Sequence, residues 1–336
     1  MDIEFHYYIT YILALRAGFK NDEAYKIAYS SQFVDDNTTE FKISQKTADA
    51  YSNYISQTSD ITKPEKNLMR IYPAFHFMPG KKEEIEQDSA MRRDGKLHIL
   101  NTIQDNSNSS AVLKEAFNTK DLYRIGIATH MYADTFAHQN FVGYYESCNS
   151  MKGLLEKVIP NIGHADAQYA PDWPANIWTD PRLIRKNSEI DNKARFLKAA
   201  GCIFEQYRLY LDPQCPRSVI DQEEKALIAE IEKEIGDHDV NNEEMPNRIA
   251  RYKEFIKKIN KGEFIDYDEN AWFNNAIDKN LIASMPLING WGAYKWKADH
   301  KESNWYGFQE AVKAHQWFVM ESIIDTITVN LELERM

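Results

Sequence analysis

The sequence predicts an all-α protein. Apolar residues recur at three- and four-residue spacing through most of the 336 residues, and Ala, Leu, Glu and Lys dominate between the turn residues. Hydrophobic residues make up 43% of the chain, enough to fill the core of one large domain. We find neither a repeat of solenoid length nor a strong linker, so we expect a single helical domain over residues 1–336.

The first 82 residues are expected to contain three helices and a loop. The first helix runs from about Asp2 to Arg16 and stops at Gly18, and the second runs from Asn21 to about Asp36. A third helix is expected from Ser44 to about Ser56. Three prolines and a glycine between Thr58 and Lys82 predict an extended, buried loop around YPAFHFMPG.

The rest of the chain is expected to be helical, with polar loops between the helices. The predicted helices are Glu83 to Asp94, Ser110 to Phe117, Thr119 to Asn140, Met151 to Val158, Ile190 to Leu211, Arg217 to Ile235, Glu243 to Ile259, Glu269 to Ile282 and Glu302 to Glu334. The last is the longest. Its apolar stripe suits central packing and contains Trp305, Phe308, Val312, Trp317, Met320, Ile323, Ile324, Ile327 and Leu331.

Charge and composition limit the classes of partner that we expect for this protein. A formal net charge of -11 argues against double-stranded nucleic acid and against an anionic membrane surface, because both require concentrated Lys and Arg. No stretch approaches the ~18 apolar residues of a membrane span, and the acidic start differs from a secretory signal. The three cysteines have no C-x-x-C spacing and are expected to be reduced. We therefore expect a cytoplasmic protein with no stable membrane insertion.

The strongest signal for a functional site is the segment THMYADTFAHQNF, inside a predicted helix. His130, Asp134 and His138 are spaced four residues apart. Each step rotates ~40° beyond a full turn and rises ~6 Å, so the three side chains share one helix face. Imidazole and carboxylate are usual ligands of Zn(II), and a carboxylate can bridge two ions. The triplet suits a metal site, although a polar helix face would show the same pattern.

Other polar residues of the first half stand in apolar surroundings. His6 lies in the first predicted helix, Asp35 follows the apolar SSQFV, and His76 is embedded in YPAFHFMPG. A buried polar group needs a partner to offset its desolvation. A structural hydrogen bond would satisfy any one of them, but together they favour a shared metal site. His164 and Asp166 in NIGHADAQYAPDWP add a further candidate pair.

In order and in kind, these residues resemble the metal ligands of the zinc-dependent phospholipases C and the fungal single-strand nucleases. That superfamily has an all-helical fold around three zinc ions. The resemblance covers about residues 1–172 and leaves 173–336 as a helical shell with the long C-terminal helix. The segments MDIEFHYY, HMYADTFAHQNF and GHADA are similar, more closely, to a family of bacterial proteins of this length that has no assigned activity.

The resemblance implies a distribution of ligands over two or three zinc ions. One ion would be held by Asp35, His76, His130 and Asp134, a second by His138, His164 and a nearby carboxylate, and a third by His6 and Asp134. Where the superfamily has an acid four residues after the last histidine, this chain has Gln168, so Asp166 or Asp172 would supply the carboxylate. Asp2, one helical turn from His6, would replace the superfamily's N-terminal chelate.

The reaction implied by this resemblance is zinc-dependent hydrolysis of a phosphoester, of phosphodiesterase, phospholipase C or nuclease type. Asp35 would orient the attacking water. The expected substrate is a small phosphoester or a phospholipid headgroup. The alternative is a non-catalytic helical protein whose metal is structural or sensory. A di-iron oxidase is disfavoured because the paired E-x-x-H motifs of ferritin-like bundles are absent from the sequence.

Overall fold

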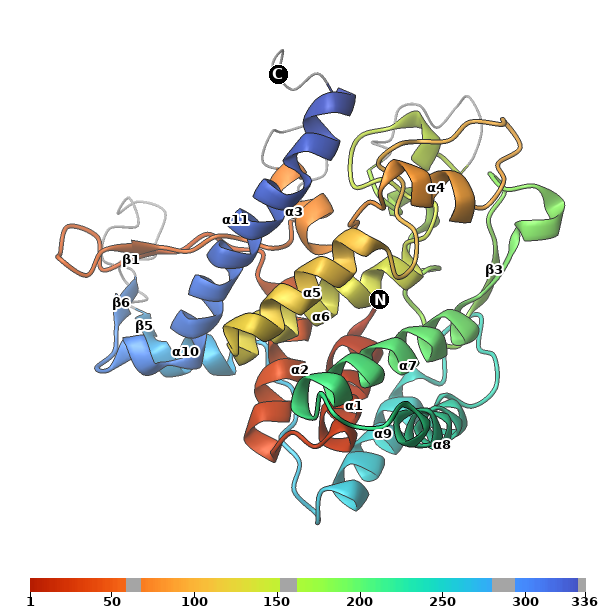
Figure 1. Cartoon of the computed structure of the whole chain (residues 1–336). Helices are drawn as coiled ribbons and strands as arrows, with labels where there is room; N and C mark the ends of the chain where they lie inside the picture. The colour runs from red at the N-terminus through yellow and green to blue at the C-terminus, as the bar shows by residue number, and fades with distance from the viewer. Residues whose placement is uncertain (59–67, 152–161, 280–293, 332–336) are drawn as a thin grey trace.

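The computed structural model of the protein describes residues 1–58, 68–151, 162–279 and 294–331 (Figure 1). These residues are mostly helical, which confirms the predicted class. The strands form three short antiparallel pairs. None of the described helices combines the length and the apolar character needed to cross a membrane.

The elements follow one another along the chain as helices interrupted by short hairpins. The helices are η1 (Glu4–Ile9, a π-helix), α1 (Thr10–Ala17), α2 (Asn21–Asp36), α3 (Leu68–Phe75), α4 (Lys82–Asp88), α5 (Ser107–Thr119), α6 (Leu122–Ala137), α7 (Asn192–Leu211), α8 (Arg217–Ile235), α9 (Met245–Ile259), α10 (Ala271–Ala276) and α11 (Asn304–Leu331). The paired strands are β1 (Lys42–Ile43) with β2 (Tyr51–Ser52), β3 (Ile177–Thr179) with β4 (Glu189–Asp191), and β5 (Ile277–Lys279) with β6 (Tyr294–Trp296).

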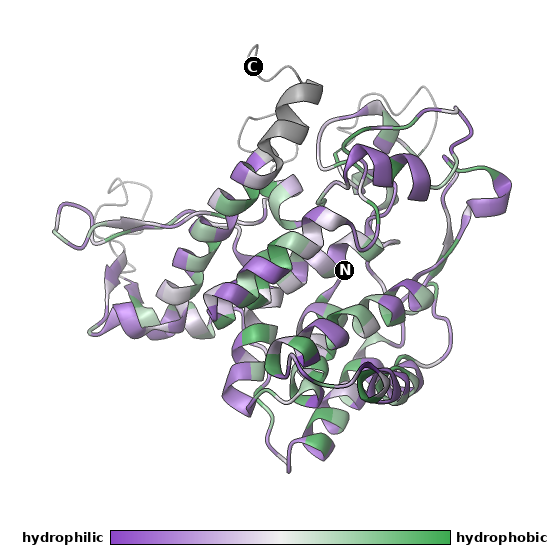
Figure 2. Ribbon diagram, in the orientation of Figure 1, coloured by the Kyte–Doolittle hydropathy of each residue, from purple (hydrophilic) through white to green (hydrophobic). Residues whose placement is uncertain are grey.

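The centre of the molecule is the packing of α2 against α6. Helix α1 lies against α2 and α7, while α5, α7 and α11 pack on α6 (Figure 1). Both hydrophobic and hydrophilic residues occur along these helices (Figure 2), and α6, which the others surround, is buried over nearly its whole length. At Gly126 the two central helices approach so closely that an added Cβ would lie 2.4 Å from the carbonyl oxygen of Ile27. This contact sets the position of the α6 turns that follow it.

Local signals explain where the central helices begin and end. Asp121 caps α6 by accepting a hydrogen bond from the Tyr123 backbone N–H, and Asp191 caps α7 through Ala194 N–H. Helix α1 ends at Gly18, whose φ of 115° only glycine adopts without strain.

The helix predicted from Ser44 to Ser56 is wrong, because this segment belongs to the β1–β2 hairpin. The Ser44 backbone N–H donates to the Tyr294 carbonyl, next to β6, and the Tyr51 ring packs against Trp296 and Trp305. These partners are more than 200 residues away along the chain. Long-range pairing therefore overrides a weak local helix propensity.

The loop predicted from Thr58 to Lys82 is wrong in part, because residues 68–75 form α3. Pro73 lies inside this short helix, near its end, and the chain leaves the helix directly at His76. Residues 59–67 lie outside the described part. The predicted helix from Met151 to Val158 also falls almost wholly outside it, since 152–161 are not described.

In the C-terminal half, the structure corrects two details of the prediction. Helix α10 ends at Ala276 and the chain continues as strand β5, although a longer helix was expected there. In α11, Trp305, Phe308 and Val312 are buried as predicted, but the Trp317 side chain is 70% exposed. His315, in the same turn, is buried, and its ring stacks on Phe75.

A buried ion pair fixes η1 in place. Nε and Nη2 of Arg248 in α9 donate to the two carboxylate oxygens of Glu4, at 2.8 and 2.9 Å, and both side chains are fully buried. The same guanidinium donates to Asp239 at 2.8 Å. In η1 itself, Thr10 Oγ1 donates to the Phe5 carbonyl at 3.0 Å and satisfies part of the irregular π-helical turn. The C-terminal half thus holds the segment that carries His6.

Gly126→Ala is expected to lower the free energy of unfolding by ~1–3 kcal/mol, because the methyl group would force α2 and α6 apart against a backbone atom. Gly201→Ala in α7 is the matched control. Its Cβ would meet only the end of the flexible Glu224 side chain, and alanine is the better helix former by ~1 kcal/mol. Urea unfolding measures both changes, and equal effects would contradict the role given to the α2–α6 contact.

Arg248→Met is expected to cost ~3–5 kcal/mol of stability, because Glu4 would remain buried without a cation. Lys257→Ala, which breaks an exposed pair with Glu254, is expected to cost less than ~1 kcal/mol. Adding Glu4→Gln to Arg248→Met should recover part of the loss. Denaturant unfolding of the three variants provides the measurement, and a small effect of Arg248→Met would show that η1 is held by other contacts.

Candidate metal centre

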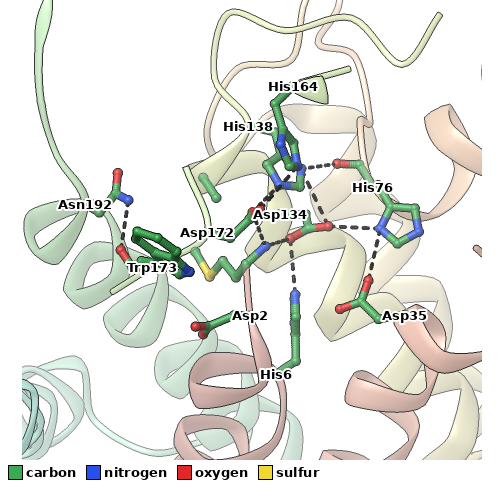
Figure 3. Close-up of polar contacts among 12 residues, drawn as sticks. Asp2, His6, Asp35, His76, Asp134, His138, His164, Asp172, Trp173 and Asn192 are labelled. Atoms are coloured by element: carbon green, nitrogen blue, oxygen red, sulfur yellow. Dashed lines mark hydrogen bonds and ion pairs between the residues drawn. The ribbon is translucent and has the colours of Figure 1, made fainter. Parts of the chain in front are cut away.

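Histidines and aspartates from distant parts of the chain converge around Asp134, in the middle of the molecule (Figure 3). They form three groups, and within each group the ligand atoms lie within 4.8 Å of one another. The groups are His6, His130 and Asp134; Asp35, His76 and His130; and His138, His164 and Asp172. Of the nine residues predicted from the sequence, the structure brings seven together in these groups and adds Asp172.

The first two groups are arranged around the buried carboxylate of Asp134. Its Oδ1 lies 3.2 Å from His6 Nε2. Its Oδ2 lies 3.2 Å from both His76 Nδ1 and His130 Nε2, and 3.6 Å from His138 Nδ1. Because the side chain is only 1% exposed, these imidazoles replace water as its surroundings. A carboxylate held between imidazoles in this way has the geometry of a bridging ligand.

The backbone orients the histidine rings. His130 Nδ1 lies 2.8 Å from the Ser31 carbonyl oxygen, and His76 Nε2 lies 3.0 Å from that of Ser56. A carbonyl oxygen only accepts, so these two nitrogens carry protons and donate to it. In the neutral tautomers, the opposite nitrogens, His130 Nε2 and His76 Nδ1, present lone pairs toward one another at 3.1 Å and toward Asp134. Two such nitrogens are stabilised by a cation between them, either a proton or a metal ion.

His6 contributes a buried imidazole to the first group. The ring is fully buried, and apart from the approach of Asp134 Oδ1 to Nε2 at 3.2 Å, neither nitrogen has a hydrogen-bond partner among the described residues. It stacks on His130 with a centroid distance of 3.7 Å. Burial, followed by the nearby His130, holds the pKa of His6 well below its usual range, so the ring is in the neutral form that binds metal. A buried imidazole without partners is costly unless it has a ligand.

Asp35 lies at the end of α2 and completes the second group. Its Oδ1 lies 3.8 Å from His76 Nδ1 and from His130 Nε2, and its side chain is 28% exposed. Burial of the carboxyl raises the pKa of Asp35, against the effect of the two histidines. For His76 burial acts in the opposite sense, yet the carboxylates of Asp134 and Asp35 outweigh it and raise the His76 pKa. The pKa values in the two groups therefore depend on each other.

The third group lies nearer the surface, and its carboxylate does not come from position 168, where this chain has Gln168. His138 Nε2 and His164 Nε2 lie 3.0 and 3.4 Å from the two oxygens of Asp172. Gln168 contributes its backbone, because its carbonyl oxygen lies 2.8 Å from His164 Nδ1 and orients that ring. Burial lowers the pKa of His138 to about 4. The carboxylate of this group comes from Asp172, four residues after Gln168.

Two predicted ligands are not brought into these groups. Asp166 Oδ2 accepts a hydrogen bond from the Met151 backbone N–H, so the carboxylate chosen from the GHADA motif points elsewhere. Asp2 lies beside the site, where its Oδ1 accepts from the Glu4 N–H at the start of η1. The Met1 amine lies 2.5 Å from Asp134 Oδ1, in the place expected for Asp2. A turn that caps η1 therefore directs the Asp2 carboxylate away from Asp134.

A hollow of about 630 Å³ opens over the three groups. Asp35, His76, Asp134, His138, His164 and Asp172 line its floor. Tyr72, Phe77 and Tyr169 form part of its walls, together with Gln32 and Thr38. Lys and Arg are absent from the described lining residues, so a negatively charged ligand would find no side-chain cation there.

Comparison with known proteins places the whole arrangement in one family. A family model described as a family of unknown function (DUF6765) matches residues 1–323. The chain belongs to this family. No curated protein and no solved structure matches it. The matched residues include the ligand groups and most of the C-terminal helical shell.

The metal content of a variant should depend on which group of ligands the substitution disrupts. His130→Ala is expected to remove metal from two groups, because His130 belongs to both, whereas His164→Ala should affect only the third. Elemental analysis of protein purified without chelator or affinity metal measures this difference, and melting temperatures should follow the same order. His238→Ala, at an exposed histidine outside the groups, is the control. Identical metal content in all four proteins would contradict the assignment.

Proposed function

We propose that the protein is a zinc-dependent hydrolase of phosphoester bonds. The observation that carries the proposal is the set of facing acceptors around Asp134, which opens into a hollow large enough for a small molecule. A purely structural metal site is usually closed by its ligands, whereas a catalytic site keeps access for water and substrate. The exposed edge of the site at Asp35 and His164 supports the catalytic alternative.

The ligand chemistry favours zinc. All the candidate ligand atoms are imidazole nitrogens and carboxylate oxygens, a set typical of Zn(II), while Ca(II) and Mg(II) prefer oxygen alone. Three groups allow two or three ions, with His130 common to two of them. When bound, such ions supply Lewis-acid activation of water and balance negative charge on phosphorus. The same ions would also offset the free-energy cost of burying the His6 nitrogens without hydrogen bonds.

Asp35 is the best candidate for the catalytic residue. Its carboxylate lines the hollow, is less buried than Asp134, and lies within 3.8 Å of two imidazoles. We assign it the tasks of orienting the attacking water and accepting its proton. Asp134, enclosed by histidines, holds the imidazole rings at fixed positions. Tyr72 and Phe77 line the same hollow.

The lining of the hollow restricts the substrate class. Because the described lining contains no Lys or Arg, and the Met1 amine is already paired with Asp134 and Asp172, the charge of a phosphoester would be balanced mainly by the bound ions. The net charge of -11 further disfavours long polyanions. The proposed substrate is accordingly a small phosphoester or a phospholipid headgroup.

Hydrolysis of bis(p-nitrophenyl) phosphate tests the proposal. Zinc-loaded protein is expected to hydrolyse it, chelation should abolish the activity, and zinc should restore it. Asp35→Asn is expected to lower kcat per bound metal ion by ~100-fold or more, because proton transfer from water is lost. His238→Ala is again the control. Metal-loaded protein that is inert on this and other phosphoesters would overturn the proposal and favour a structural or sensory metal.

A further inference from the structure

Two side chains of the C-terminal half donate to the backbone beside the metal centre. They are His315 of α11 and Arg195 of α7. Helix α11 packs against α3, and α7 packs against α6 (Figure 1). Helix α3 ends directly before His76, and α6 ends directly before His138. Each of the two side chains therefore reaches the end of a helix that is followed by a metal ligand.

His315 donates to the last turn of α3. Its Nε2 lies 3.0 Å from the Ala74 carbonyl oxygen, which receives no hydrogen bond from a backbone amide of the described chain. Its ring stacks on Phe75 at a centroid distance of 5.0 Å. Burial lowers the pKa of His315 to about 3, so the ring is neutral and its one N–H faces the carbonyl. The contact fixes the chain two residues before His76.

A histidine at position 315 is costly to the fold. Its Nδ1 is buried and has no hydrogen-bond partner among the described residues. A buried polar atom without a partner destabilises the folded state, and an apolar side chain would avoid that cost. The same apolar side chain would leave the Ala74 carbonyl without a donor. The hydrogen bond from Nε2 is therefore the feature that explains the histidine.

Arg195 makes the corresponding contact at the end of α6. Its Nη1 donates to the carbonyl oxygen of Ala137, the last residue of the helix, at 3.1 Å. The Phe141 backbone N–H donates to the His138 carbonyl, so no described backbone amide donates to that of Ala137. A cation is favourable at the carbonyl end of a helix. The contact fixes the peptide unit that joins Ala137 to His138.

The two ligand segments held by these contacts are also joined to each other. His138 Nδ1 lies 2.9 Å from the His76 carbonyl oxygen, and the His138 ring stacks on Phe77 (Figure 3). His76 belongs to the second ligand group and His138 to the third. Because a carbonyl only accepts, Nδ1 of His138 donates, and Nε2, which faces Asp172, is the nitrogen that can bind a metal ion. Helices α11 and α7 thus hold the two ends of one connected arrangement.

We propose that His315 and Arg195 are positioning residues of the metal centre. Through the Ala74 carbonyl, His315 holds His76 in place within the second group. Through the Ala137 carbonyl, Arg195 holds His138 in place within the third. Loss of such an outer partner typically weakens metal binding by ~10–100-fold. The inference rests on the metal site of the proposed function and does not depend on the substrate.

Co(II) titration of metal-free protein tests the role of His315, because the visible absorption of bound Co(II) reports both affinity and ligand geometry. His315→Leu is expected to weaken one binding step by ~10-fold or more and to change its spectrum. His315→Gln places an amide N–H near the position of Nε2 and should keep the wild-type affinity to within about threefold. If His315 only stabilised the fold, His315→Leu would lower the melting temperature of the metal-free protein and leave the Co(II) affinity and spectrum unchanged.

Arg195→Met tests the second contact, with Arg208→Met as the matched control. Arg208 also lies in α7, and its Nη1 donates at 3.2 Å to the carbonyl of Ala17, the last residue of α1. Both substitutions remove a donor from the end of a helix, but only Arg195→Met is expected to weaken Co(II) binding, by ~10-fold or more. In a His164→Ala background, in which the third group is already disrupted, Arg195→Met should have little further effect.

The outcomes separate this inference from the proposed function. Unchanged Co(II) affinity and spectrum in either folded variant overturn the role of that residue while leaving the metal centre standing. Equal losses in Arg195→Met and Arg208→Met also overturn the role of Arg195, since the effect would then be a general loss of stability. Failure of the unsubstituted protein to bind Co(II) overturns the metal centre itself, and the inference falls with it. Melting curves of the metal-free variants establish folding, and Arg195→Met decides the outcome if His315→Leu is not folded.

Discussion

The burial of one carboxylate among several imidazoles is the constraint on which the rest of the structure depends. Asp134 lies in the last turn of α6 with almost no exposure, paired with the Met1 amine and surrounded by histidines from η1, from the residue after α3 and from α6 itself. A buried ion of this kind is expensive unless its partners are held at fixed distances. The close approach of α2 and α6 at Gly126 provides that precision, because it fixes Ser31 and Asp35 against His130.

The C-terminal half has a physical role in the same arrangement. Arg248 anchors η1 through Glu4, and the segment at residues 265–268 is tied to Tyr7 and Tyr29. These contacts hold the segment that carries His6 and the helix that carries Asp35 against the C-terminal half. A DUF6765 chain reduced to its ligand motifs would lose them.

The helices with strong periodicity were predictable, as α8 illustrates, because their apolar faces and flanking turn residues agree. The β1–β2 hairpin was not, since its pairing is decided by contacts with β6, some 250 residues later. α3 was missed because a proline within a short helix reads as a loop signal. Trp317 was expected in the buried stripe of α11 but is exposed, because the helix phase turns its side chain away from the core.

Residue type and four-residue spacing were enough to single out His130, Asp134 and His138 as one candidate site, because helix geometry alone places them on one face. Which carboxylate joins His138 and His164 was decided by the tertiary structure. Asp166 is nearer in sequence, but the turn after His164 directs it to the Met151 backbone and brings Asp172 to the site. Sequence determines which groups exist and, within a helix, their direction. Only the packing of distant segments decides which of them meet.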